Sequence, residues 1–76
     1  MTISDELINR VFASAWDIAV QSNPMLLAKH EAQNTIEQAR ARIGALLAEG
    51  YSEEDALKFI VADLLDPNSA LYKSTP

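Results

Sequence analysis

The sequence predicts an all-α protein: a small antiparallel bundle of three helices with a long central helix and a short C-terminal helical turn or tail. Only two Gly and three Pro interrupt the 76 residues. Apolar residues recur every three or four positions, and no segment alternates with the two-residue period of a strand. We expect a single helical domain over residues 1–66, followed by a C-terminal tail over residues 67–76.

The first helix is expected from Asp5 to about Gln21. Ser4 is suited to accept a hydrogen bond from a free N–H group of the first turn. Asp5 and Glu6 place negative charge at the positive end of the helix dipole. The apolar face is wide and includes Trp16, which we expect to lie in the core beside another helix or, alternatively, to anchor a partner.

The second helix is expected to run from Pro24 to Glu49. Asn23 is a suitable N-cap, and Pro24 fits the first helical position. An unbroken helix of this length would extend about 39 Å. Its apolar residues alternate spacings of three and four, as in a coiled-coil seam: Ala28, Ala32, Ile36, Ala39, Ile43 and Leu46. An alternative break lies at Asn34-Thr35. A continuous helix would be longer than its neighbours can cover, leaving part of the seam for a partner.

The third helix follows a turn at Gly50, the natural left-handed residue after a helix end. Ser52 is expected to cap this helix, with Asp55 in the reciprocal position of a capping box. The helix should reach about Leu65, where the sequence DPN ends it. The C-terminal segment is expected to form a short helical turn or a frayed tail, in which Leu71 and Tyr72 could fold back on the bundle.

The composition argues against several kinds of chemistry. The chain has no Cys and a single His, so we expect no disulfide, no metal site and no cofactor. We expect His30 to be solvated or to act as a cap. No carboxylate pair or Gly-rich loop suggests catalysis, so we expect a protein that is not an enzyme. The acidic, polar N-terminal segment does not resemble a signal peptide, and we expect a cytoplasmic location.

The formal net charge of −5 opposes binding to phosphate backbones and to anionic membrane surfaces. The stretch EGYSEED, residues 49–55, resembles the Gly-aromatic turn and Ser-capped helix of ubiquitin-associated domains, although Glu49 stands where those domains usually carry Met. Residues 46–65 are similar to the helix pair of ribbon-helix-helix repressors, but residues 24–40 predict a helix where that family has a basic strand. In a helix-turn-helix arrangement, Glu53 to Asp55 would face phosphate with like charge. These resemblances are local, and none identifies a family.

The predicted function is therefore a non-catalytic protein–protein interaction module. It would be a small acidic regulator, inhibitor or accessory subunit of bacterial or phage type, acting through an apolar helix face flanked by charges. The alternatives are a self-assembling homodimer with a structural or scaffold role, and a nucleic-acid-associated regulator or acidic nucleic-acid mimic. No small-molecule ligand or membrane is expected as a partner. The candidate partner-binding residues are Trp16, Ala32, Ile36, Ala39, Ile43, Glu53, Glu54 and Asp55.

Overall fold

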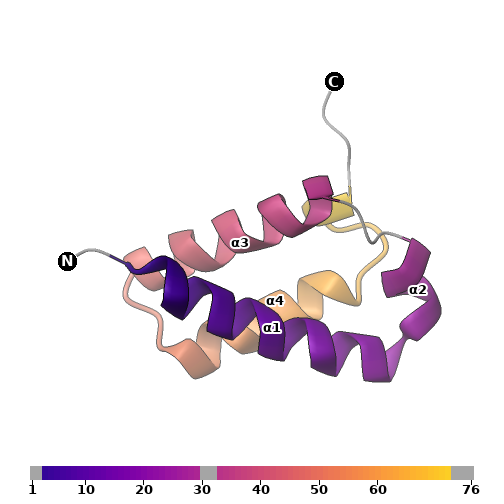
Figure 1. Ribbon diagram of the computed structural model, residues 1–76, viewed down its shortest axis with the longest axis horizontal. Coiled ribbons are helices and arrows are strands. Elements are labelled where there is room, and N and C mark those ends of the chain that lie inside the picture. Colours follow the sequence, from indigo (N-terminus) through magenta and orange to yellow (C-terminus); the bar gives the residue numbers. More distant parts are fainter. Residues whose placement is uncertain (1–2, 30–32, 73–76) are drawn as a thin grey trace.

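The computed structural model describes residues 3–29 and 33–72, and within them all regular secondary structure is helical (Figure 1). The elements are α1 (Asp5–Ser22), α2 (Pro24–Lys29), α3 (Gln33–Ala48), α4 (Glu53–Leu64) and a final 3₁₀ turn, η1 (Ala70–Tyr72). The all-α prediction is confirmed. The described residues form four α-helices, however, where the sequence predicts three.

Residues predicted as caps define both ends of α1. Ser4 is the N-cap, and its Oγ accepts a hydrogen bond from the Leu7 N–H at 3.1 Å. At the other end, the Asn23 N–H donates to the Ala19 carbonyl at 2.9 Å. The Asn23 Oδ1 accepts from the Leu26 N–H at 3.2 Å, in the first turn of α2. A single Asn therefore ends one helix and starts the next.

The predicted long central helix is replaced by two helices, α2 and α3. Helix α2 packs against α1 at one end of the molecule, and α3 then runs back along α1 and α4 (Figure 1). Burial supplies the physical reason. Leu27 and Ile43 are both buried in the same core, yet on one straight helix their directions would differ by about 160°. Both residues can enter that core only if the helix is interrupted between them.

The turn between α3 and α4 has the predicted glycine and Ser52 cap, but among the described residues the Asp55 carboxylate does not accept the reciprocal hydrogen bond of a capping box. Gly50 adopts a φ of 101°, in the left-handed region. Its N–H donates to the Leu47 carbonyl at 3.1 Å, and the Tyr51 N–H donates to the Leu46 carbonyl at 3.2 Å, which together form a Schellman motif. Ser52 then caps α4, since its Oγ accepts from the Asp55 N–H at 3.1 Å.

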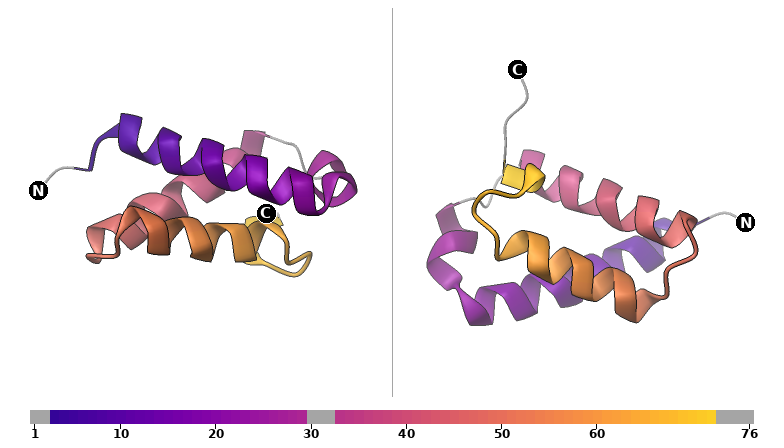
Figure 2. Two further views of the ribbon diagram at one scale, coloured as in Figure 1. Left: turned by 90° about the horizontal axis from the view of Figure 1, so that it is seen from below. Right: turned by 180° about the vertical axis from the view of Figure 1, so that it is seen from behind.

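The core lies between α1, α3 and α4, which contact one another pairwise. Figure 2 shows α1 and α4 side by side, with α3 running in the opposite direction. η1 packs on α3 and α4, where Leu71 is buried and the Tyr72 hydroxyl donates to the Leu64 carbonyl. Leu71 and Tyr72 thus fold back on the bundle, which is one of the two arrangements that the sequence left open. The buried apolar residues are Val11, Ala15, Ala19, Leu27, Ala39, Ile43, Leu46, Leu47, Ala56, Ile60, Leu64 and Leu71.

Candidate functional site

The apolar seam expected to receive a partner lies mostly inside the molecule. Ala39 and Ile43 have no exposed surface, and Ile36 is half-buried. Ala32 lies outside the described residues. Because α3 is only 16 residues long, α1 and α4 together cover its apolar face. This corrects the expected position of the interface, since Ala39 and Ile43 are core residues of the single chain.

Trp16 is half-buried and packs against the core from α1. Its ring lies 5.6 Å from that of Phe12, centroid to centroid, with an angle of 35° between the ring planes. The two side chains follow one another by one helical turn, so each supports the other against the core. Trp16 thus lies at the edge of the core, and its role as a partner anchor stays a prediction.

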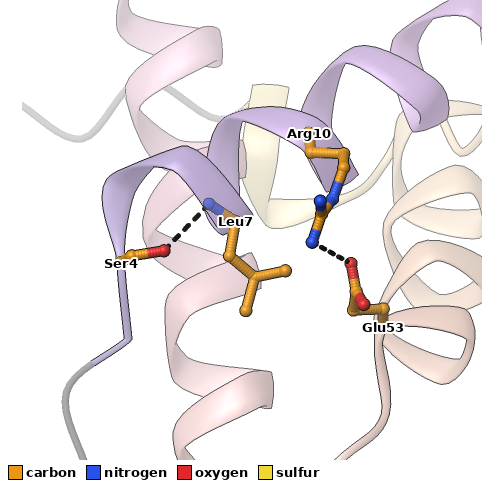
Figure 3. A network of polar contacts seen from close by, with 4 residues as sticks. All are labelled: Ser4, Leu7, Arg10 and Glu53. Atoms are coloured by element: carbon orange, nitrogen blue, oxygen red, sulfur yellow. Dashed lines mark hydrogen bonds and ion pairs between the residues drawn. The ribbon is translucent and has the colours of Figure 1, made fainter.

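The acidic residues at the start of α4 do not have equivalent surroundings. Figure 3 shows the Arg10 Nη2 atom of α1 against the Glu53 Oε1 atom, at 3.1 Å. Glu54 lies 3.7 Å from the Lys58 ammonium, one turn along the same helix. Among the described residues, Asp55 has no ion pair. Of the three predicted acids, Asp55 therefore has the carboxylate most available to a partner.

Two exposed aromatic residues lie close to Asp55. Tyr51 and Phe59 are 41% and 45% exposed, and their rings meet edge to face with centroids 5.3 Å apart. Neither residue belongs to the partner-binding set predicted from the sequence. A signal was nevertheless present for Phe59, because it lies outside the helical row Ala56, Ile60 and Leu64 that enters the core.

Phe59 also lies between two acidic residues on one face of α4. Asp55 precedes it by four residues and Asp63 follows it by four, which places each carboxylate about 6 Å away along the helix axis. We call the group formed by Tyr51, Asp55, Phe59 and Asp63 the aromatic–acidic surface. It combines exposed aromatic side chains with negative charge.

At Asp63 this surface meets a pocket with both polar and apolar lining, formed by Gln38, Ala41, Arg42, Asp63, Asp66, Ser69 and Leu71. The pocket has a volume of about 560 Å³ and lies between α3 and the segment that joins α4 to η1. The Arg42 Nε lies 3.8 Å from Asp63 Oδ2, too far for a hydrogen bond. The Asp66 Oδ1 atom accepts from the Asn68 N–H at 2.9 Å.

The C-terminal end of this region is held by Tyr72. Burial raises the pKa of its hydroxyl above the ordinary value of 10.0. The neutral hydroxyl donates to the Leu64 carbonyl at the end of α4. This contact connects η1 to α4 and so positions the segment that carries Ser69.

No group of three or more His, Cys, Asp or Glu side chains in residues 3–29 and 33–72 is arranged to hold a metal ion. His30 lies outside this part of the chain. None of the helices described is both long and apolar enough to span a bilayer.

Comparisons with known proteins add no family assignment. Neither the protein-family models, nor the curated proteins, nor the solved structures searched contain a match to this chain.

Proposed function

We propose that this protein is a non-catalytic protein-binding module whose aromatic–acidic surface binds a partner protein. The partner would place an apolar side chain against Tyr51 and Phe59, with basic side chains near Asp55 and Asp63. A role as a small regulator, inhibitor or accessory subunit fits this mode of action.

The exposed aromatic pair is the observation that carries the proposal. With roughly 200 Å² of surface per ring residue, exposures of 41% and 45% leave about 170 Å² for a partner to cover. Covering that area would contribute about 4 kcal/mol before the costs of ordering are subtracted. Aromatic residues that are held in place by a neighbour suit this role, because little side-chain entropy remains to be lost on binding.

Charge determines which partners this surface favours. Asp55 has no ion pair in the described part of the chain, and Asp63 is only loosely approached by Arg42. The chain as a whole carries a formal charge of −5. A basic partner would therefore be steered toward this side of the molecule and would bind more weakly as salt is added.

The alternatives receive less support from the same residues. In a two-fold dimer through this surface, Asp55 and Asp63 of one copy would face their equivalents, so like charges would repel. An acidic nucleic-acid mimic would use Glu53 and Glu54, but both already contact basic side chains of the same chain.

The experiment compares Phe59→Ala with a matched control, Ile18→Ala, in a quantitative pull-down from the source cell's lysate. Ile18 is 42% exposed and lies on α1, so its truncation removes a similar exposed apolar side chain from another element. We expect a stoichiometric partner to be retained by the wild type and by Ile18→Ala. Phe59→Ala should deplete it at least about tenfold, as expected for an interface hot spot.

A second pair of variants tests the charges. Asp55→Asn should weaken binding to the same partner, whereas Glu53→Gln should change it little because Glu53 already pairs with Arg10. The proposal fails if every variant retains the partner equally. It also fails if only the chain itself is recovered and sedimentation gives a dimer that Phe59→Ala leaves intact.

A further inference from the structure

The aromatic–acidic surface follows a straight stripe along the exposed side of α4. Asp55, Phe59 and Asp63 are spaced by four residues, and the exposed Ala62 follows Phe59 by three. On an α-helix these four positions fall within an arc of about 100°. The stripe extends about 12 Å from Asp55 to Asp63, with Phe59 at its middle.

The stripe places a large side chain beside a small one. Phe59 is 45% exposed, and its ring is supported by the edge-to-face contact with Tyr51. Ala62, in the next turn, presents only a methyl group. A helix laid along α4 can pack a side chain beside the Phe59 ring and approach closely at Ala62, which is the ridge-and-groove arrangement of packed helices.

The backbone of the bound segment also needs hydrogen-bond partners. All regular secondary structure in residues 3–29 and 33–72 is helical, so this part of the chain has no sheet edge to which a strand could be added. An extended segment lying on Tyr51 and Phe59 would turn N–H and C=O groups toward apolar rings. A helix avoids this cost, because its backbone hydrogen bonds are internal.

The spacing of the charges fits a helix as well. Asp55 and Asp63 each lie about 6 Å from Phe59 along the axis of α4, and residues four apart on a partner helix have the same spacing. A polyproline segment repeats its face only every three residues, or about 9 Å. Asp55 has no ion pair in the described part of the chain, so its carboxylate is available to a basic side chain.

We propose that the partner binds α4 through an amphipathic helix of its own. This helix carries a large apolar residue with Lys or Arg four residues before and four residues after it. The apolar side chain packs against Tyr51 and Phe59, and the basic side chains lie at Asp55 and Asp63. The inference rests on the proposed function, because it specifies the partner of the same surface.

The test uses the intact chain and synthetic peptides of known sequence. The helical probe is built of Ala and Gln, is about 18 residues long so that it is helical in water, and carries a central Leu with Lys four residues before and after. One control has the same composition with Lys two residues before and after the Leu, the spacing of an extended strand. A second control keeps the Lys and Leu positions of the probe but has Pro beside the Leu, which breaks the helix.

Each peptide is titrated into ¹⁵N-labelled protein and followed by two-dimensional NMR. We expect the helical probe to give saturable shifts at the backbone amides of Asp55, Phe59 and Ala62. The first control loses both charge contacts and should bind about fivefold more weakly. The proline control should also bind more weakly, because its backbone cannot form a continuous helix on α4. Equal or tighter binding by either control would overturn the inference.

Variants assign the binding to the stripe. Phe59→Ala should abolish the saturable shifts, and Asp55→Asn and Asp63→Asn should each weaken the probe about two- to fivefold. The matched control Ile18→Ala should bind as the wild type does. Circular dichroism checks that each variant is folded. An equal loss in Ile18→Ala, or shifts spread over all acidic residues, would contradict binding at this stripe.

The two proposals can fail separately. If the helical probe has no advantage over its controls while Phe59→Ala still loses the partner in the pull-down, the helical partner is wrong and the proposed function stands. If the probe binds as expected while Phe59→Ala retains the partner from the lysate, the aromatic–acidic surface is not that partner's binding site and the proposed function fails.

Discussion

The two glycines of the chain should respond in opposite directions to substitution by alanine. Gly50 adopts a φ of 101° in the turn after α3, and a Cβ atom added there meets nothing within 4 Å. Gly44 lies within α3 without a positive φ, and its added Cβ would lie 3.4 Å from Ile8 Cδ1. Gly50 therefore tests backbone conformation alone, whereas Gly44 tests helix propensity against a close contact.

For Gly50→Ala, the left-handed conformation costs about 1–2 kcal/mol. The reduced freedom of the unfolded chain offsets about 0.4–1 kcal/mol of this cost. The net loss is about 1 kcal/mol, which lowers the Tm by roughly 4–8 °C for a domain of this size. Gly50→Asn should lose less, because Asn tolerates the left-handed region better than Ala.

For Gly44→Ala, the gain in helix propensity is up to about 1 kcal/mol. The approach to Ile8 reduces this gain only slightly, because Cδ1 is the end of a flexible side chain that can move by a few tenths of an ångström. The expected result is a variant as stable as the wild type or more stable, with a Tm raised by a few degrees.

Urea unfolding followed by far-UV circular dichroism measures all three variants, with the slope of the transition compared to ensure that the unfolded state is unchanged. The expected order of stability is Gly44→Ala, wild type, Gly50→Asn, Gly50→Ala. If Gly50→Ala equals the wild type, the left-handed conformation does not hold. If Gly44→Ala is the less stable alanine variant, the space beside Ile8 is smaller than the structure indicates.

Two further predictions concern the core and the C-terminal turn. Ile43→Ala should destabilise the protein by about 2–5 kcal/mol in urea unfolding, because Ile43 has no exposed surface. If the Ile43 side chain lay on the surface instead, its truncation would cost less than about 0.5 kcal/mol. Tyr72→Phe should lower the free energy of unfolding by about 1 kcal/mol, because it removes the hydrogen bond to the Leu64 carbonyl. Burial raises the pKa of the Tyr72 hydroxyl, so the folded state prefers its neutral form. The stability of the wild type should therefore be retained below pH 10 and should fall as the pH rises through the pKa of Tyr72 in the folded state. The alkaline fall should be smaller in Tyr72→Phe, and an identical pH profile in the two proteins would show that Tyr72 does not contribute it.

Much of the local structure could be predicted from the sequence. Caps at Ser4, Asn23 and Ser52 and the left-handed turn at Gly50 were all identified from residue type and position. These features depend on hydrogen bonds between residues no more than five positions apart, so nearby sequence contains the information that determines them. The helical class followed from the same local preferences.

The candidate site was harder to predict, because it depends on which faces are left uncovered. The stripe through Ala39 and Ile43 has the spacing of an interface, but spacing does not distinguish a surface covered by another chain from one covered by the same chain. Phe59 lies outside the row that enters the core, yet its contact with Tyr51 depends on how the turn positions α4. Of the residues in this surface, Asp55 was among those predicted from the sequence, whereas Tyr51 and Phe59 were not.

The sequence by itself determined the helical class, most helix ends and the acidic character of the surface, because residue type and short-range hydrogen bonds decide these. Only the tertiary structure decided that α2 and α3 are separate, that Glu53 pairs with Arg10 from 43 positions away, and that Ser69 is buried beside a pocket. Each of these depends on contacts between segments far apart in the chain. Such contacts follow from how the helices share one core, and no local pattern specifies them.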